Sequence, residues 1–287
     1  MDKIFLFNND CRNVLSQLPA NKIDCVITDP PYFIDGMGDN WQLNSLKEKA
    51  SKAGVVQSMP VGMKFDPQQG IDLQKFMEQV SKEVYRILKP GGFYLSFSQA
   101  RLYHRMAMAI ELSGFEIRDM LVWKREGQAK AFSQDHFVYK MNISEEEKEK
   151  IIKSLDGRKT PQLKPQIEPI VLAQKPKEGT FVQNWLKYNI GLIDVTQSLD
   201  GMFPGTVMDV PKDKSAIAHF TVKPLPLIEH LIKIFSPENA IICDPFLGSG
   251  TTGVACINTN RKFIGIELND EYYKLAKERI EQAYECN

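Results

Sequence analysis

Short apolar runs alternate along this chain with longer segments in which apolar residues recur every three or four positions. The first pattern is typical of buried strands and the second of amphipathic helices. The runs that predict strands are 3–8, 23–28, 93–97, 115–118, 120–124, 240–243 and 262–266. The segments that predict helices are 12–18, 71–88, 100–113, 224–235, 254–258 and 270–284. Strands that alternate with helices indicate an α/β fold, in which helices cover both faces of a parallel sheet.

Turn and cap residues mark two of the predicted helix ends. Pro90-Gly91-Gly92 follows the helical spacing of residues 71–88, and we expect these three residues to end that helix. Ser144 precedes the acidic residues 145–147, and lysines follow them. This order predicts a further helix over 144–155 with Ser144 as its N-cap, because the charges suit the helix dipole.

Two long segments lack a clear period. Residues 34–69 contain several glycines and prolines, and a loop of this length is usually functional or mobile. A lid, a DNA-facing loop and a solvated insertion without a role all fit it. Residues 126–218 are polar and contain several prolines. Within this segment, residues 150–190 include eight basic and three acidic residues, which suits phosphate contacts and base reading but equally an ordinary solvated appendage.

Composition narrows the class of protein only slightly. The chain has 287 residues, of which 43% are hydrophobic, enough for a packed core in one or two domains. Its 36 basic and 36 acidic residues balance, so net charge does not point to nucleic acid. Five scattered cysteines without a CxxC pair argue for a reducing compartment and against a zinc site. No signal peptide or spanning apolar run is evident, so we expect a cytoplasmic protein with no membrane contact and no metal.

Asp29-Pro30-Pro31-Tyr32 follows the predicted strand 23–28. The prolines should end that strand because they lack the N–H of the ladder, and ligands bind at such carboxyl ends in open α/β sheets. The Asp29 carboxylate and the Pro30 carbonyl would offer two acceptors beside the flat ring of Tyr32. This set suits a planar base with an exocyclic amino group. A capped strand end with Tyr32 in the core would fit the same residues.

Gly248-x-Gly250-x-x-Gly253 lies between a predicted strand and a helix, and Glu267 ends the next strand. Glycines let a nucleotide approach the backbone, and an acid in this place binds ribose hydroxyls. A tight structural turn would also require glycines. No lysine follows them as a P-loop requires, which excludes an ATPase of that kind.

Asp244-Pro245-Phe246 places an acid and an aromatic ring directly before the glycines. A carboxylate there attracts a cationic amino acid group and repels a pyrophosphate, which favours S-adenosylmethionine over NAD. The Asp-Pro-Pro-Tyr stretch has no role in hydride transfer, but it has an evident role in methylation of an amino group.

Together these motifs resemble the amino-group DNA methyltransferases of the β arrangement, in which Asp-Pro-Pro-Tyr comes first and Phe-x-Gly-x-Gly comes last. The resemblance covers residues 4–33, 70–125 and 219–280. The further segments that resemble family blocks are Asn9–Leu15, Leu88–Gly92 and His219–Pro224. Asn9 stands where many relatives have Gly, and Phe220 interrupts a common His-Pro-Thr-x-Lys-Pro sequence.

The resemblance implies a Rossmann-like methyltransferase fold, entered at a permuted point, with a seven-stranded and mostly parallel sheet. It divides the chain into a catalytic half at 1–125, a target-recognition insert at 126–218 and a cofactor-binding half at 219–287. The insert would read DNA.

The resemblance also implies roles for individual residues. Asp29, Pro30, Pro31 and Tyr32 would bind and activate the target amino group. The residues expected at the cofactor are Asp10 and Cys11 for its adenine, Glu267 for its ribose, Lys223 for its methionine carboxylate, and Asp244, Phe246, Gly248, Ser249, Gly250 and Thr251 around its methionine end. We therefore expect transfer of a methyl group from S-adenosylmethionine to the N6 amino group of an adenine flipped out of duplex DNA.

Several alternatives stay open at this point. A cytosine-N4 methyltransferase uses the same chemistry, although its motif usually begins with Ser, and an RNA N6-adenine enzyme is a more distant candidate. An NAD-dependent oxidoreductase and an inactive DNA-binding module belong to other classes. A cognate restriction endonuclease, a homodimer and association with the nucleoid are further expectations for a DNA methyltransferase.

Overall fold

A computed structural model describes residues 3–31, 67–125, 127, 129, 131–198, 201–211 and 223–285. Contacts divide the chain into two compact units. The larger unit combines Met1–Trp123 with Glu168–Asn287, and the smaller one is Lys124–Ile167. The larger unit contains the sheet and nearly all of the predicted site residues. No helix among the described residues is both long and apolar enough to cross a bilayer.

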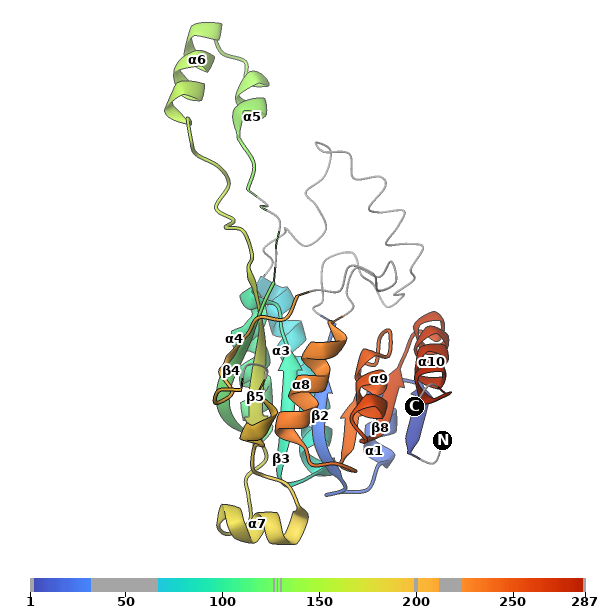
Figure 1. The fold of residues 1–287 in the computed structure, drawn as a ribbon. Coiled ribbons are helices and arrows are strands. Elements are labelled where there is room, and N and C mark those ends of the chain that lie inside the picture. The colour runs from blue at the N-terminus through green and yellow to red at the C-terminus, as the bar shows by residue number, and fades with distance from the viewer. Residues whose placement is uncertain are drawn as a thin grey trace. The chain divides into compact units, whose positions relative to one another are not determined.

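The described residues form one sheet of eight strands in the order β1-β8-β7-β2-β3-β5-β4-β6 (Figure 1). The first five strands in this order pair in parallel, whereas β5 runs antiparallel to β3. The strands are β1 Ile4–Asn8, β2 Ile23–Thr28, β3 Leu88–Phe97, β4 Glu116–Lys124, β5 Ile167–Gln174, β6 Val207–Met208, β7 Ile241–Asp244 and β8 Lys262–Glu267.

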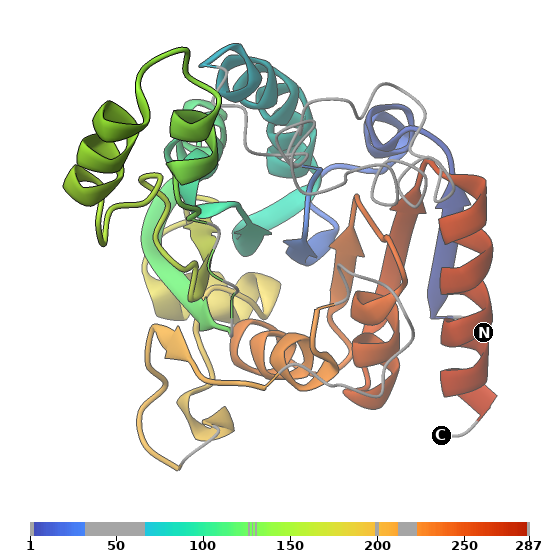
Figure 2. The same cartoon turned by 90° about the horizontal axis from the view of Figure 1, so that it is seen from above.

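Helices cover both faces of this sheet, with blue and teal helices on one side and orange ones on the other (Figure 2). The helices of the larger unit are α1 Cys11–Gln17, α3 Pro67–Ile87, α4 Tyr103–Leu112, α7 Phe181–Tyr188, α8 Leu225–Phe235, α9 Thr251–Asn258 and α10 Asp270–Glu285, with short 3₁₀ helices at Ala100–Leu102 and Val195–Gln197. The predicted α/β architecture, with a mostly parallel sheet, is confirmed.

Alternation along the central strands builds two separate cores. In β2, Cys25 and Ile27 pack in the cluster that contains residues of α8, α9 and α10. Val26, between them, packs in the cluster that contains residues of α1, α3 and α4. Successive side chains of a strand point to opposite faces, so a strand buried on both faces is apolar throughout. The run 23–28 is buried at every position and is apolar except at Asp24 and Thr28, and the predicted strand matches β2 residue for residue.

Parallel pairing places the carboxyl ends of five strands at one edge of the sheet. The register pairs Asn8 with Glu267, Asp244 with Gly265, and Thr28 with Ser96. Because β5 is antiparallel, its amino end lies at this same edge, where Phe97 pairs with Ile170. Residues that follow β1, β2, β7 and β8, and residues that begin β5, therefore meet at the edge where such sheets bind ligands.

The predicted end of the helix 71–88 is wrong in one respect. Helix α3 ends at Ile87, and Pro90-Gly91-Gly92 lies within β3 rather than in a turn. Gly91 donates to the carbonyl of Lys175, and Lys175 donates to Gly92. A side chain on Gly92 would lie 2.9 Å from the carbonyl oxygen of Asp24, so the glycine permits close approach of the neighbouring strand. Sheet pairing thus decides the conformation of a sequence that locally suits a helix stop.

The strands after residue 125 differ from the prediction. The smaller compact unit is Lys124–Ile167, and the chain then returns to the sheet as β5, whereas the recognition insert 126–218 stays a prediction. This strand and β6 bring the number of strands to eight instead of seven, and they make the sheet mixed. The two short strands predicted at 115–118 and 120–124 are one strand, β4.

The smaller unit contains two helices, α5 Asp135–Tyr139 and α6 Glu145–Ser154. The predicted N-cap of α6 is confirmed. The Ser144 hydroxyl accepts from the backbone N–H of Glu147, and the Glu147 carboxylate accepts from the backbone N–H of Ser144. This reciprocal capping box satisfies two N–H groups at the helix start, which matters because α6 has no buried residue.

We expect Ser144→Ala to destabilise α6 by about 1 kcal/mol, because it removes the hydroxyl that accepts from the backbone N–H of Glu147. Hydrogen exchange of the amides at 145–150 should then accelerate. Ser154→Ala, at the last residue of the same helix, is the matched control and should leave those amides unchanged. Equal protection in wild type and Ser144→Ala would contradict the stabilising role of this cap.

Candidate active site

Asp29 follows directly after the last residue of β2 and is half-buried, whereas Pro30 is buried. The preceding residue, Thr28, donates its hydroxyl to the Asp244 carboxylate at 2.6 Å. This bond joins the ends of β2 and β7, which are 216 residues apart in the chain. The structure therefore brings the Asp-Pro-Pro stretch to the start of the glycine-rich loop. Tyr32, the fourth residue of the motif, lies outside the described residues.

Lys223 connects Asp29 to a second carboxylate. Its ammonium nitrogen lies 2.5 Å from Asp29 Oδ2 and 2.6 Å from Glu168 Oε1, and 4.9 Å from the centre of the Phe97 ring. Burial by itself would lower the pKa of Lys223, but the two carboxylates and their hydrogen bonds outweigh it and raise that pKa. Lys223 is thus a cation held between two anions at the strand ends. Residues 219–222, which precede Lys223 in the block that begins at His219, lie outside the described residues.

Asp244 is buried at the end of β7, with 3% of its surface exposed. One carboxylate oxygen accepts from the Thr28 hydroxyl and from the backbone N–H of Phe246, and the other accepts from the Thr252 hydroxyl at 2.7 Å. Burial raises the pKa of Asp244 to about 6, and these hydrogen bonds oppose part of that rise. Asp244 therefore ties the end of β2, the loop after β7 and the start of α9 together.

In the glycine-rich loop, Gly248 faces free space, whereas Gly250 is in close contact with a neighbouring helix. Gly248 has φ +54°, and a side chain there would meet nothing closer than 3.9 Å, so the loop leaves room for a ligand above it. Gly250 has φ +85° and lies so close to Ala276 that an added Cβ would be 3.0 Å from its Cα. The Ser249 carbonyl accepts from Arg279, which fixes the loop to α10. The buried Thr251 hydroxyl has no hydrogen-bond partner among the described residues.

Glu267 ends β8 beside this loop. Its carboxylate accepts from the backbone N–H of Gly248 at 2.8 Å and of Asn269 at 2.9 Å. Burial raises the pKa of Glu267 even though these bonds favour the ionised form. The acid predicted to bind ribose hydroxyls is therefore adjacent in space to the first glycine of the fingerprint, as the spacing of the two motifs requires.

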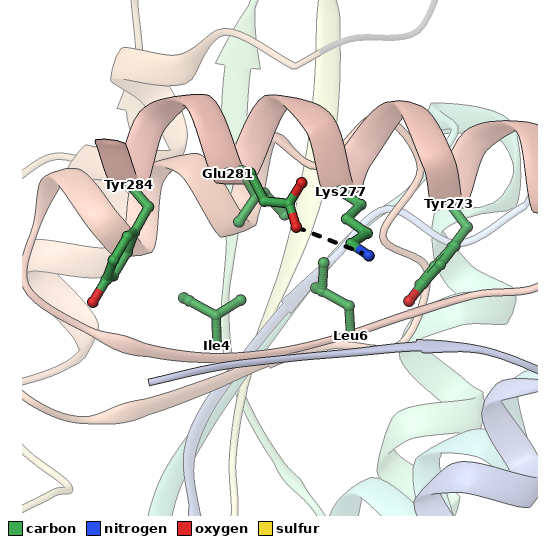
Figure 3. Close-up of a pocket in the computed structure, with 7 residues that line it drawn as sticks. Ile4, Leu6, Tyr273, Lys277, Glu281 and Tyr284 are labelled. Atoms are coloured by element: carbon green, nitrogen blue, oxygen red, sulfur yellow. Dashed lines mark ion pairs between the residues drawn. The ribbon is translucent and has the colours of Figure 1, made fainter. Parts of the chain in front are cut away.

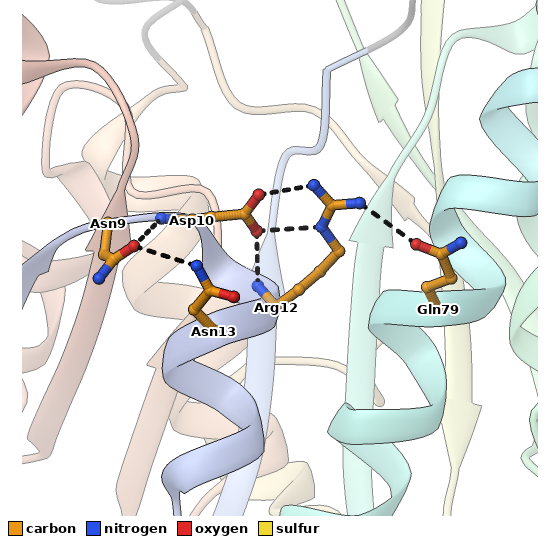
Figure 4. Close-up of polar contacts among 5 residues, drawn as sticks. All are labelled: Asn9, Asp10, Arg12, Asn13 and Gln79. Atoms are coloured by element: carbon orange, nitrogen blue, oxygen red, sulfur yellow. Dashed lines mark hydrogen bonds and ion pairs between the residues drawn. The ribbon is translucent and has the colours of Figure 1, made fainter.

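Asp10 and Cys11 begin α1 at the end of β1 (Figure 4). Asp10 is the N-cap, and its carboxylate accepts from the backbone N–H and the guanidinium of Arg12. The hydrogen bond from Arg12 lowers the pKa of Asp10. Cys11 is buried, and burial raises the pKa of its thiol to about 12, so the thiol stays neutral. Arg12 also reaches Gln79 of α3 at 3.3 Å.

The sequence alone does not single out three residues at this edge. Phe76, within the predicted helix 71–88, lies 5.9 Å from the ring of Phe246 and 5.5 Å from the Arg12 guanidinium. Thr28 was treated as the last residue of a strand. Glu168 is one of the three acidic residues of the segment 150–190. Its position directly before the apolar run 169–173 is the signal that could have placed it at the end of a strand, where functional residues often lie.

The predicted site residues therefore gather at one edge of the sheet, on the ends of β1, β2, β7 and β8. Their chemistry fits S-adenosylmethionine. The space above Gly248 and the Thr251 hydroxyl, which lacks a partner within the described ranges, suit the methionine end, and Glu267 suits the ribose. A lysine that would meet the methionine carboxylate is present, but in this structure Lys223 contacts Asp29 and Glu168.

A cavity of about 170 Å³ lies elsewhere, between β1 and α10 (Figure 3). Its lining residues are Ile4, Leu6, Tyr273, Lys277, Ile280, Glu281 and Tyr284. Among them, the Lys277 ammonium and the Glu281 carboxylate, one turn apart on α10, lie 3.9 Å from each other. None of the predicted site residues lines this cavity.

A sequence model of the DNA methylase family, which covers enzymes of the N6 and N4 type, matches residues 23–278. The chain belongs to the N6/N4 DNA methylase family. It is therefore a DNA methyltransferase, and its cofactor is the S-adenosylmethionine of that family.

Individual relatives match over nearly the whole chain. Type II methyltransferase M.HindIII of Haemophilus influenzae is 28% identical, over 96% of this chain and 94% of its own. Type II methyltransferase M2.DpnII of Streptococcus pneumoniae is 27% identical, over 100% of this chain and 92% of its own.

Solved structures share the fold. TTHA0409 of Thermus thermophilus, described as a DNA modification methylase and complexed with S-adenosylmethionine, is 20% identical with a TM-score of 0.58, over 98% of this chain and 94% of its own. The cytosine-N4-specific PvuII DNA methyltransferase is 16% identical with a TM-score of 0.63, over 99% of this chain and 92% of its own. Because a cytosine-N4 enzyme has the same fold, the fold does not distinguish adenine from cytosine as the target base. That distinction depends on the residues of the site.

We expect Asp244 to make the stability of the protein depend on pH. Its folded pKa of about 6 exceeds the ordinary value of 3.8, so its stabilising contribution is complete below about pH 4 and is lost as pH rises through 6. Relative to Asp244→Asn, the unfolding free energy of the wild type should fall by about 3 kcal/mol between pH 4 and pH 7. Urea unfolding at several pH values measures this difference. Parallel profiles for the two proteins would contradict it.

Proposed function

We propose that the protein is a site-specific DNA methyltransferase that modifies the N6 amino group of adenine in duplex DNA. The observation that supports this most is the position of Asp29. Its carboxylate lies at the end of β2, beside the Thr28–Asp244 contact that marks the start of the glycine-rich loop. A motif that begins with Asp, rather than the Ser usual in cytosine-N4 enzymes, favours adenine.

The proposed chemistry increases the nucleophilicity of an amino group. The lone pair of an adenine amino nitrogen is delocalised into the ring, so the nitrogen is a poor nucleophile. Acceptance of its two hydrogens by the Asp29 carboxylate and the Pro30 carbonyl would draw the nitrogen towards tetrahedral geometry. Positive charge develops on the nitrogen as the N–CH3 bond forms and the S–CH3 bond breaks with its electron pair left on sulfur, and the Asp29 carboxylate stabilises that charge. Release of one amino proton to water or to Asp29 then gives the neutral methylamino product. Neither residue forms a covalent bond to the base.

We assign the cofactor to the edge formed by the ends of β1, β7 and β8. Glu267 would accept from the ribose hydroxyls, and Asp10 with Cys11 would contact the adenine. Asp244, Phe246, Gly248, Ser249, Gly250 and Thr251 would surround the methionine end. S-adenosylmethionine would supply a methyl group on a positively charged sulfur, and the residues of this loop would hold the methionine end of the cofactor near the amino nitrogen.

The target base must leave the DNA duplex to reach Asp29, because a base that is stacked and paired cannot present its amino group to the Asp29 carboxylate and the methyl donor together. Tyr32 is the aromatic residue proposed to stack on it. The insert, residues 126–218 in the sequence-based division, is the proposed reader of the DNA sequence. A cognate restriction endonuclease, a homodimer and association with the nucleoid belong to the same proposal, since relatives of the chain carry Type II names.

Asp29→Ala should abolish methyl transfer and leave cofactor binding intact, because the carboxylate contacts the base and not the cofactor. A tritiated-methyl transfer assay measures turnover, and calorimetry with the analogue sinefungin measures binding. We expect a loss of at least about 1,000-fold in turnover, comparable to removal of a main charge-stabilising group. Glu271→Gln, on the exposed surface of α10, is the control. Substantial turnover by Asp29→Ala would refute the assignment of Asp29.

The base and the site are tested together by sequencing modified bases in DNA of a host that expresses the protein. The proposal predicts N6-methyladenine at one recurrent sequence, and none when Asp29→Ala is expressed instead. N4-methylcytosine at a recurrent sequence would overturn the choice of adenine and would retain the methyltransferase class.

A further inference from the structure

Glu168 lies at the catalytic edge because β5 runs against the direction of its neighbour. The backbone N–H of Ser98, just after β3, donates to the carbonyl of Pro169 at 2.9 Å. The pairing of Phe97 with Ile170 fixes the same register. Glu168 therefore sits beside the carboxyl end of β3, next in the sheet to the strand that carries Asp29.

The Glu168 carboxylate is buried, with 6% of the residue exposed, and it lies 2.6 Å from the Lys223 ammonium. A buried carboxylate is costly unless a cation compensates it. Lys223 is that cation, and it is also bound to Asp29 at 2.5 Å. Two anions from different strands thus share one ammonium, while the Phe97 ring covers it from a third side.

A shared ammonium has a defined position, whereas a lysine with one partner can rotate on its four-carbon stem. Glu168 attracts the Lys223 ammonium towards β5, so Lys223 shares its charge between two carboxylates. Lys223 therefore compensates only part of the Asp29 charge, and it does so from one side of that carboxylate. The ammonium can then orient the Asp29 carboxylate without neutralising it completely. An oriented carboxylate is what acceptance of an amino hydrogen requires, since a displacement of about 1 Å can cost about 100-fold in rate.

We propose that Glu168 is a positioning residue for methyl transfer, acting through Lys223 on the orientation of Asp29. This inference rests on the proposed role of Asp29, but it holds for an adenine or a cytosine amino group. It places Lys223 on the side of the target base rather than at the cofactor carboxylate. Loss of the Glu168 charge should therefore slow the transfer step and leave cofactor affinity unchanged.

The first test compares Glu168→Gln with wild type in single-turnover methyl transfer to unmethylated phage genomic DNA at saturating S-adenosylmethionine. We expect the rate to fall about 10- to 100-fold, with sinefungin affinity by calorimetry within twofold of wild type. Glu83→Gln is the matched control, because Glu83 is also paired with a basic residue, Arg86 at 2.8 Å, but lies in α3 outside the insert and the proposed site. It should transfer at the wild-type rate. A wild-type rate for Glu168→Gln, or a loss explained by weaker sinefungin binding, would overturn the inference.

The second test asks whether Glu168 acts through Lys223. If it does, the double variant Glu168→Gln, Lys223→Met should transfer no more slowly than Lys223→Met alone. Once Lys223 is absent, Glu168 has no ammonium through which to influence Asp29. Losses that multiply would contradict the proposed route. In Lys223→Met the two carboxylates lose their shared cation, and the double variant removes one of these two charges, so its melting temperature should exceed that of Lys223→Met. A cooperative melting transition for each variant shows that it is folded.

Asp29→Ala in the same assay separates this inference from the proposed function. High turnover by Asp29→Ala would mean that Asp29 is not the acceptor, and both would fall. No turnover by Asp29→Ala together with a wild-type rate for Glu168→Gln would overturn only the role of Glu168.

Discussion

The parallel pairing of β2 with β7 is the constraint on which the site depends. Cys25 pairs with Ile242, and Val26 pairs with Cys243, so two segments more than 200 residues apart end at the same edge. Beyond the last backbone pair of these two strands, the Thr28 hydroxyl donates to the buried Asp244 carboxylate and joins the two strand ends. Asp29 and the loop that contains Gly248 follow directly from these two strand ends. A base bound at Asp29 and a cofactor bound over the loop would therefore face each other without a domain closure.

Buried charge at this edge is arranged in pairs and networks. Asp244 has its oxygens occupied by hydroxyl and amide donors, Glu267 accepts from two backbone N–H groups, and Lys223 is compensated by Asp29 and Glu168. Each arrangement offsets the cost of removing an ion from water. Each also fixes the orientation of a group, since a buried ion with specific partners has few alternative positions. The site is in this sense built before any ligand arrives.

Much of the fold and part of the site could be predicted from the sequence. The run 23–28 and the helix that begins after Ser144 carry strong local signals, namely a mostly apolar run and an N-cap serine followed by acids, and the structure agrees with both. Pro90-Gly91-Gly92 shows the limit of such signals, because its pairing with Lys175 is a contact between distant residues. Strand β5 is hard to predict because its apolar run begins with Pro169 and lies in a polar, proline-containing region.

The same limit applies to the charges at the site. Glu168 and Lys223 are 55 residues apart, and only the antiparallel placement of β5 brings them together. Local sequence gives no period or spacing for such a pair. Asp29 and Glu267 were predictable because each lies within a motif whose spacing follows from the strand–turn–helix unit around it.

The most direct measurement of the central claim is a crystal structure of the protein with sinefungin bound. The account predicts that the ligand ribose contacts Glu267, and that its amine, which replaces the transferable methyl group, points towards Asp29 within about 6 Å, close enough for a base amino group to lie between them. A ligand bound in another part of the molecule, or with its amine directed away from Asp29, would contradict the account.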